Sequence, residues 1–411
     1  MPALPPPASF SLKSSLTITD PDSLDALCGR LRSAEHIGID TEFVSEDTFF
    51  PELCLIQVST TDELATIDTR AIEDVNPFWR VLTEGEHVTI LHAGREELNF
   101  MLRAIDAIPK QLFDVQIAAG FCSNEYPSAY GSVVSRFLGH KPDKGEQRTD
   151  WRKRPLTKAQ IHYALEDVRY LIPLYRRFVD ILTERERMEW LEEEMQSWQE
   201  EVAGALNRKD WRRVSGIGKL GPTSLAIVRE LWHWRYEEAQ KRNRPQRRVL
   251  RDDLIVELAK RKVDSPDKIM AIRGMERTAV KKNANELADC VRRGLASPVE
   301  REKGGRRRQP PSQLNLLGQF LAPALGTICR RAEIAASLAG TASSVRDLVA
   351  YRMGFSPDGV SRNGKMQLPI LARGWRAELV GNVIDDLLDG KKSIRISNAK
   401  DTDPLVFEDV D

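Results

Sequence analysis

Strand-like and helix-like patterns alternate between residues 15 and 121, and this alternation constrains the fold more than any other feature of the chain. Short apolar runs predict five strands, at residues 16–18, 36–43, 54–60, 64–69 and 88–93. Helical spacing of apolar residues occupies two of the intervening segments, at 23–34 and 95–105. A chain of this kind forms an α/β domain around a central sheet. The third and fourth runs are close enough for an antiparallel hairpin, so we expect a mixed sheet.

Beyond residue 157 the pattern becomes almost entirely helical. Thr157 fits an N-cap, and residues 157–201 fit one long helical stretch with at most one break. Strand signals are then nearly absent until about residue 390. Residues 297–312 are rich in charged residues, glycine and proline, which predicts a linker before a second helical unit. The acidic end of the chain, residues 401–411, is expected to be disordered.

Length and composition indicate a multidomain soluble protein. At 411 residues the chain is long enough for two or three domains. No apolar run approaches the roughly 18 residues of a membrane span, and the N-terminus lacks the pattern of a secretory signal. The five cysteines are scattered and form no CxxC pair. This predicts reduced thiols in a cytoplasmic protein and argues against a zinc site or a disulfide framework.

The net charge of zero conceals an uneven distribution of charge along the chain. Residues 208–308 contain 28 Lys and Arg but 14 Asp and Glu, which gives this segment a net charge of +14 and the remainder −14. Basic blocks lie at 241–248 and 301–309. Blocks of this kind commonly contact the phosphate backbone of nucleic acids. A solvated face and a flexible linker would have the same composition.

The motif GIDTEF at residues 38–43 places two carboxylates on one strand. Asp40 and Glu42 are two positions apart, so their side chains leave the same face of the strand. Two anions on a buried strand repel each other, and their burial is costly unless a cation lies between them. Oxygen ligands of this kind suit Mg²⁺ or Mn²⁺. The pair is equally compatible with a solvated strand end.

A tyrosine and an aspartate are spaced four residues apart in the helical segment that follows. Tyr163 and Asp167 therefore share one helix face, where a phenol and a carboxylate could orient a water molecule. His162 is five residues before Asp167, and residues five apart diverge by about 140° on a helix, against about 40° for four apart. Tyr163 is thus the better partner of Asp167. An amphipathic helix with a packed tyrosine is the alternative interpretation.

Three motifs together resemble the exonuclease motifs of the ribonuclease D family. They are GIDTEF at 38–43, LHAGREELNF at 91–100 and DWRKRPLTKAQIHYALEDVRYL at 150–171. That family belongs to the DEDD superfamily of 3′–5′ exonucleases, tyrosine subclass, and has a ribonuclease H-like α/β fold. LCLIQVS at 53–59 and LFDVQIAAGF at 112–121 are similar to the strands between these motifs. The similarity spans most of residues 15–200 in the expected order.

Two further segments resemble helical modules of the same family. Residues 221–300 are similar to an HRDC domain, an all-α module associated with nucleic-acid binding, and residues 341–390 are similar to the second C-terminal helical domain of bacterial ribonuclease D. We expect Trp232, Trp234 and Trp375 to pack in the cores of these modules. The implied organisation is a disordered lead-in at 1–14, an exonuclease domain at 15–210, an HRDC domain at 218–298, a linker at 299–312, a second HRDC-like domain at 313–393 and an acidic tail at 394–411.

The resemblance implies roles for individual residues. Asp40 and Glu42 match the acid pair of the first motif, and Tyr163 and Asp167 match the tyrosine and acid of the third. In the family, the second motif contributes an aspartate three residues after the glycine of HAG, and this chain has Glu97 there. The four acids are expected to bind two divalent ions, Mg²⁺ or Mn²⁺. Tyr163 is expected to position the attacking water.

Helix periodicity distinguishes Glu97 from its neighbour Glu96. The apolar face of the helix at 95–105 consists of Leu98, Met101, Leu102 and Ile105. At about 100° per residue, Glu97 lies roughly 90° from the centre of that face and Glu96 roughly 170° away. Glu97 can therefore reach a cleft beside the core. Compared with aspartate, its added methylene moves the carboxylate by on the order of 1 Å, which can cost roughly a hundredfold in rate.

The activity implied by the resemblance is that of a 3′–5′ exoribonuclease, which releases nucleoside 5′-monophosphates from RNA 3′ ends. The expected substrates are tRNA precursors. We expect a cytoplasmic monomer that uses no small-molecule cofactor. Phosphate contacts, and hence salt-sensitive binding, are expected from the basic residues Lys241, Arg242, Arg244, Arg247 and Arg248.

Other activities are compatible with the same residues. A DNA 3′–5′ exonuclease would use the same acids. An RNA-binding protein with a weakened site is a second alternative, because glutamate replaces aspartate at residue 97. A partner of a helicase is a third, suggested by the HRDC resemblance alone. The chain contains no GxxxxGK[ST] loop, so it is not itself a nucleotide-driven motor.

Overall fold

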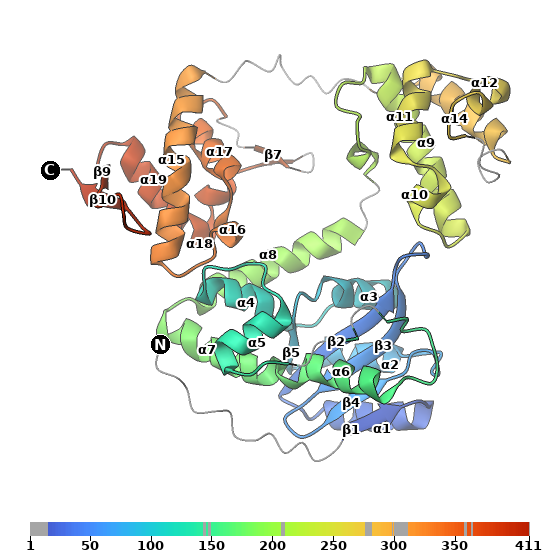
Figure 1. Ribbon diagram of the computed structural model, residues 1–411, viewed down its shortest axis with the longest axis horizontal. Coiled ribbons are helices and arrows are strands. Elements are labelled where there is room, and N and C mark those ends of the chain that lie inside the picture. Colours follow the sequence, from blue (N-terminus) through green and yellow to red (C-terminus); the bar gives the residue numbers. More distant parts are fainter. Residues whose placement is uncertain are drawn as a thin grey trace.

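The computed structural model describes most of the chain, which folds into one α/β domain and two helical domains (Figure 1). The described residues are 15–142, 145–146, 149–206, 210–275, 282–297, 299, 311–356, 360–362 and 365–410. The predicted lead-in at 1–14 lies outside them, as does most of the predicted linker. Within the described residues, every helix is too short or too polar to serve as a membrane span.

A six-stranded mixed sheet forms the centre of the α/β domain. Its strands are β1 (Ser15–Ile18), β2 (His36–Val44), β3 (Glu52–Ser59), β4 (Leu64–Ile67), β5 (Val88–Leu91) and β6 (Gln111–Asp114). Their spatial order is β1-β4-β3-β2-β5-β6. β3 runs antiparallel to both β2 and β4, and the other pairs are parallel. All five predicted strands are present, and the predicted antiparallel hairpin is confirmed.

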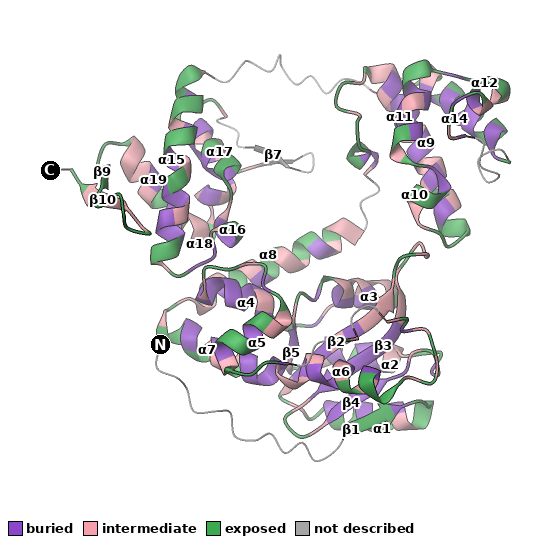
Figure 2. Cartoon of the chain, in the orientation of Figure 1, coloured by how far each residue is buried: buried purple, intermediate pink, exposed green. Residues whose placement is uncertain are grey.

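Seven helices surround this sheet: α1 (Pro21–Leu31), α2 (Asn76–Glu84), α3 (Arg95–Ile105), α4 (Val115–Cys122), α5 (Tyr130–Leu138), α6 (Lys158–Arg169) and α7 (Leu171–Glu184). α1, α2 and α3 share an apolar core with the face of the sheet from which Ile37 and Ile39 project. α6 and α7 pack on the other side, with α4 and α5 beside α7. Buried residues accordingly concentrate in the sheet and on the inner faces of the helices (Figure 2). The strand expected over 112–121 is wrong from residue 115 onwards, because Asp114 ends β6 and caps α4.

The long helical stretch is divided into α6, α7 and α8 (Met188–Leu206), so the expectation of at most one break is wrong. Pro173 explains the first break, because it has no N–H for the carbonyl of Arg169 and its ring crowds that turn. The second break is a Schellman motif. Glu186 adopts a left-handed φ of 55°, and the N–H of Arg187 donates to the carbonyl of Leu182 at 2.8 Å.

The first helical domain has an apolar core of its own. It consists of a short turn at Trp211–Arg213 and α9 (Pro222–Lys241), α10 (Gln246–Val249), α11 (Asp252–Arg261), α12 (Pro266–Met270) and α14 (Ala284–Ala296). Trp232 is buried in this core, as predicted. Trp234 is only partly buried, and its indole N–H donates to Glu286 at 2.6 Å.

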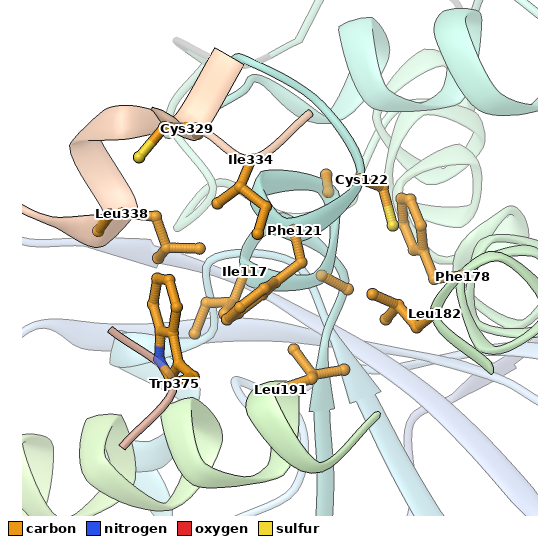
Figure 3. Close-up of a cluster of buried hydrophobic side chains, with 14 of the residues drawn as sticks. Ile117, Phe121, Cys122, Phe178, Leu182, Leu191, Cys329, Ile334, Leu338 and Trp375 are labelled. Atoms are coloured by element: carbon orange, nitrogen blue, oxygen red, sulfur yellow. The ribbon is translucent and has the colours of Figure 1, made fainter. Parts of the chain in front are cut away.

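The second helical domain shares its core with the α/β domain. Its helices are α15 (Ser312–Arg331), α16 (Ala336–Ala339), α17 (Ala342–Arg352), α18 (Gly374–Arg376) and α19 (Asn382–Leu388), with helical turns at Ile370–Ala372 and Ala377–Gly381. Trp375 is fully buried against Phe121 of α4 (Figure 3). It also stacks on Trp190 of α8. Beside it, Arg376 forms an ion pair with Glu194 at 2.6 Å. The two domains therefore form one packed body.

Four short strands follow in the C-terminal part: β7 (Val360–Arg362), β8 (Lys365–Gln367), β9 (Lys392–Ile396) and β10 (Leu405–Asp409). The prediction of disorder over 401–411 is wrong, because β10 pairs antiparallel with β9. Its acidic residues are matched by basic ones, as in the ion pair of Glu408 with Arg395. Phe407 packs against the shared core. The sequence-based prediction missed this strand pairing because it relied on the acidic composition of the segment.

Candidate active site

β2 carries Gly38, Asp40 and Glu42 on one face, towards the junction of α6 and α7. A Cβ added at Gly38 would lie 2.3 Å from Oγ of Ser59 and 3.1 Å from Cβ of Leu171. The glycine thus permits a close approach, and Oγ of Ser59 donates to the carbonyl of Val168 at 2.9 Å. This contact brings the C-terminal half of α6 next to Asp40.

α6 presents Tyr163 and Asp167 to the same region. Thr157 begins the helix with a capping box, in which Gln160 is the reciprocal partner. The hydroxyl of Tyr163 donates a hydrogen bond to the carboxylate of Asp167. His162 is exposed, so the prediction that Tyr163 is the partner of Asp167 is confirmed.

The structure brings three of the five predicted site residues to one cavity. This cavity has a volume of about 260 Å³. Its lining residues are Ile39, Asp40, His92, Tyr130, Tyr163, Asp167 and Leu171. They come from β2, the end of β5, α5, α6 and α7. Strands and helices that are far apart in the sequence therefore meet at one concave site.

The carboxylates of the site interact strongly with one another. Burial raises the pKa of Asp40 well above its ordinary value, and the charges of Glu97, Asp167 and Glu42 raise it further. Burial is also the main reason that the pKa of Glu42 rises to about 8. The pKa of Glu97 and that of Asp167 each rise to about 7, again mainly through burial. Without a cation, these acids oppose each other's ionisation.

Glu97 approaches this cluster from the other side of β2. Its carboxylate accepts a hydrogen bond of 2.5 Å from the hydroxyl of Thr41, whose side chain leaves the face opposite to Asp40 and Glu42. Glu97 is buried, whereas Glu96 is partly exposed and accepts from Asn99 at 3.2 Å. The predicted inward orientation of Glu97 is confirmed. Glu97 does not line the cavity itself, although its charge acts on Asp40.

A network of hydrogen bonds fixes the turn between β5 and α3. The N–H of Gly94 donates to Oδ2 of Asp114 at 2.9 Å, and the other oxygen of Asp114 caps α4 by accepting from the N–H of Gln116 at 2.8 Å. Nε2 of His92 lies 3.0 Å from the carbonyl of Ser128. Burial is the main cause that lowers the pKa of His92, which favours the neutral ring.

Sequence reasoning missed these supporting residues. Asp114 could have been recognised, because an aspartate between a strand pattern and a helix pattern is a typical N-cap. His92 lies within a motif that was identified, yet nothing in its spacing marked it as a cavity residue. Tyr130 comes from a separate helix, and its buried hydroxyl accepts from the N–H of Tyr170 at 3.2 Å.

The loop before α6 is anchored to the sheet by one arginine. Nε and Nη2 of Arg154 donate to the carboxylate of Asp68, each at 2.6 Å, and Nη2 also donates to the carbonyl of Cys54 at 2.8 Å. Trp151 is buried beside Tyr163, with 6.2 Å between the ring centres. The loop therefore supports the position of Tyr163 in the cavity.

The donor set at the site consists of carboxylate oxygens, which fits Mg²⁺ or Mn²⁺. In the described part of the chain, no three side chains of the His, Cys, Asp and Glu types converge tightly enough to enclose an ion. Mg²⁺ characteristically takes one or two protein carboxylates and completes its shell with water and substrate phosphates. Asp40, Glu42, Glu97 and Asp167 suit such an open site.

The five predicted nucleic-acid-binding residues lie at the end of α9, in the turn that follows and on α10, and all are exposed. Arg242 forms an ion pair with Glu238 of its own helix. This end of the first helical domain contacts the loop between β2 and β3. Oδ1 of Asn243 accepts from the N–H of Phe49 at 3.1 Å, and the ring of Phe49 meets that of Tyr236 edge-on, with 5.1 Å between centres.

Comparisons with known proteins agree with this architecture. A family model for 3′–5′ exonucleases matches residues 16–183, and one for the HRDC domain matches residues 224–291. Ribonuclease D of Sphingobium indicum is 30% identical over 396 residues, which cover 93% of this chain and 97% of that one. Ribonuclease D of a Jannaschia species is 32% identical over 398 residues, which cover 93% and 98%.

A solved structure extends the similarity to the arrangement in space. The crystal structure of Escherichia coli RNase D, an exoribonuclease involved in structured RNA processing, superposes with a TM-score of 0.77. It is 26% identical and covers 92% of this chain and 99% of its own. The α/β domain thus has the ribonuclease H-like exonuclease fold, and the domain at 224–291 is an HRDC domain. The chain belongs to the ribonuclease D family and is a 3′–5′ exoribonuclease.

Proposed function

We propose that this exoribonuclease trims tRNA precursors from their 3′ ends by two-metal-ion hydrolysis and releases nucleoside 5′-monophosphates. The observation that carries the proposal is the cavity that joins Asp40, Tyr163 and Asp167, with Glu42 and Glu97 close enough to raise the pKa of Asp40. Carboxylates that oppose each other's ionisation are stabilised by a bound cation.

Each predicted site residue then has a role. Asp40, Glu42, Glu97 and Asp167 would hold two Mg²⁺ or Mn²⁺ ions, Glu97 either directly or through water. When bound, such ions would supply the activation of a water and the stabilisation of the leaving 3′-oxygen. The hydroxyl of Tyr163 donates a hydrogen bond to Asp167, and a phenolic oxygen that donates can also accept, so Tyr163 would position the attacking water by accepting a hydrogen bond from it. This use of Tyr163 would place the enzyme in the tyrosine subclass.

The helical domains would contribute contacts that bind RNA. We propose that Lys241, Arg242, Arg244, Arg247 and Arg248 contact phosphates. Their exposure and their place beside the loop between β2 and β3 support this. We also propose that the second helical domain is HRDC-like. We also propose that the enzyme acts as a monomer.

The test is Mn²⁺-dependent release of nucleotides from a 3′-extended tRNA precursor. Glu97→Gln keeps the length of the side chain but removes the negative charge that would bind the cation, and it should lower the rate by roughly 10–100-fold. Glu97→Asp should keep the rate or raise it. Glu96→Gln is the matched control, since it makes the same change at the neighbouring partly exposed position.

Each alternative outcome has a distinct meaning. Full activity of Glu97→Gln would reject Glu97 as a metal ligand. Equal hydrolysis of a matched DNA strand would point to a nuclease without RNA preference. Binding of the precursor without any Mn²⁺- or Mg²⁺-dependent cleavage would replace the catalytic proposal with an RNA-binding one.

A further inference from the structure

Gln57 is a wholly buried polar residue with no partner. It lies in the middle of β3, its exposed fraction is 0%, and neither its Nε2 nor its Oε1 has a hydrogen-bond partner. Its neighbours Leu55, Ile56 and Val58 are buried and apolar. Buried polar groups in native proteins are almost always hydrogen-bonded. An unpaired amide that is wholly buried at this position therefore calls for a functional explanation.

The register of the sheet places Gln57 beside Asp40. Thr17, Thr66, Gln57 and Asp40 stand directly opposite one another on the adjacent strands β1, β4, β3 and β2. Side chains paired in this way leave the same face of a sheet, with Cβ atoms about 4.5–5.5 Å apart. This polar row lies beneath α6, which contacts β2, β3 and β4.

The other polar groups near Gln57 already have partners. The hydroxyl of Thr66 donates to that of Thr17 at 3.4 Å. The hydroxyl of Ser59, two positions along β3 on the same face, donates to the carbonyl of Val168. Both hydroxyls use their protons in these bonds, and Asp40, directly opposite Gln57, is the only one of these groups that can carry a negative charge. Its carboxylate is therefore the strongest acceptor beside the amide of Gln57.

We infer that Gln57 is a positioning residue for Asp40 and that its Nε2–H group donates to the Asp40 carboxylate when that carboxylate holds metal ions. The inference rests on the proposed function, since it assumes that Asp40 is a metal ligand. A ligating carboxylate that also accepts a hydrogen bond is fixed in orientation. Loss of such a supporting partner typically costs 10–100-fold in metal affinity or activity.

The test compares Mn²⁺ affinity and metal-free stability of the full-length chain, measured by titration calorimetry and by thermal melting in chelator. Gln57→Met keeps length and flexibility but removes both hydrogen-bonding groups. We expect its Mn²⁺ affinity to fall by roughly 10–100-fold. Its metal-free melting temperature should be unchanged or higher, because an apolar side chain suits a site without partners.

Thr89→Val is the matched control. Thr89 is also fully buried, its hydroxyl also lacks a partner, and it lies in the same sheet. It stands opposite Ile37, so its side chain leaves the face away from Asp40. This variant should bind Mn²⁺ like the wild type. A loss of affinity equal to that of Gln57→Met would show that any unpaired polar group in the sheet has this effect.

Two results would overturn the inference in distinguishable ways. Wild-type Mn²⁺ affinity in Gln57→Met, or in Gln57→Leu if the methionine variant does not fold, would show that Gln57 does not act on Asp40. Wild-type Mn²⁺ affinity in Asp40→Asn would instead remove the proposed metal site and the inference with it. Loss of affinity in Asp40→Asn and Gln57→Met, with Thr89→Val unaffected, supports both.

Discussion

At the scale of residues, the site concentrates ionisable groups that a stable core would avoid. The pKa of Glu42 is raised to about 8, and the pKa values of Glu97 and Asp167 are each raised to about 7. Between their ordinary values and these raised ones, the native chain binds more protons than the unfolded chain. The stability that these groups contribute is therefore fully present at low pH and falls as pH rises through this window.

We predict that metal stabilises the protein more at pH 8 than at pH 5.5. In chelator, the free energy of unfolding should fall by on the order of a few kcal/mol between these two pH values because of the site acids. Mn²⁺ binds the ionised carboxylates, so its effect on the melting temperature should grow with pH. Thermal melting in chelator and in Mn²⁺ at both pH values checks this. An equal effect of Mn²⁺ at both would contradict it, and Asp40→Asn should weaken the pH dependence.

For some candidate site residues, their spacing in the sequence predicted the direction in which each side chain points. The strand period predicted that Asp40 and Glu42 share a face. The helix period predicted that Tyr163 faces Asp167 and that Glu97 points inward. Their assignment as site residues came from the family resemblance. Gln57 could not be found in this way, because its significance depends on which residue stands opposite it in the sheet. His92 and Tyr130 likewise become neighbours only through the packing of separate elements.

At the scale of elements, the approach of the α6–α7 junction to β2 depends on Gly38. We predict that Gly38→Ala destabilises the protein by about 1–3 kcal/mol, as expected for overpacking of a close contact. The new methyl group would collide with Ser59 and Leu171. Urea denaturation of the chain checks this, with Gly131→Ala as control, because a Cβ there meets nothing within 4 Å.

A double variant shows whether the collision is the cause. Ser59→Ala removes the nearer atom, although it also loses the hydrogen bond to the carbonyl of Val168. The cost of Gly38→Ala combined with Ser59→Ala should therefore be smaller than the sum of the two single costs. If the two costs simply add, the collision with Ser59 is not the reason that Gly38→Ala destabilises the protein.

The sequence predicted helices and strands correctly where the signal is a local pattern of residues. The predictions failed where an element depends on an unusual backbone conformation or on pairing with another segment. The five strands follow from short apolar runs, and the start of α6 follows from its cap. The break at residue 186 had no signal, because a glutamate there occupies the left-handed conformation that glycine usually marks. β10 was missed because its pairing with β9 depends on a strand that the sequence did not predict.

At the scale of the whole molecule, the loop between β2 and β3 links the HRDC domain to the site. We predict that Phe49→Ala lowers the rate on a 3′-extended tRNA precursor by about 2–10-fold, since an aromatic pair contributes about 0.5–1.5 kcal/mol. Hydrolysis of a dinucleotide should change little, because its single phosphodiester is the one at the cleavage site and it offers no further phosphate to the HRDC domain. The ratio of the two rates is the measurement. Tyr236→Ala removes the other ring of the pair and should have the same effect, and a normal rate ratio in Tyr236→Ala would contradict the prediction.

The core shared by the α/β domain and the second helical domain leads to a second prediction at this scale. Trp375→Ala should cost about 3–5 kcal/mol and destabilise the α/β domain together with the second helical domain. Hydrogen exchange should show faster opening in α4 and α8 as well as in α18, with the HRDC domain unaffected. Trp234→Ala is the comparison, because Trp234 packs in the separate HRDC core. Faster exchange confined to the second helical domain would contradict a common core.

The position of Trp375 so late in the chain also has a consequence during synthesis. About 180 residues separate the end of α8 from the end of α19, and at 5–20 residues per second the ribosome needs roughly 10–40 s to make them. During that interval the catalytic sheet is complete, but the surface around Phe121 and Trp190 stays exposed because Trp375 is not yet packed against it. An interrupted chain that ends within the HRDC domain would keep its site residues but leave this surface bare. Aggregation, before any loss of chemistry, is then the expected fate of the unfinished protein.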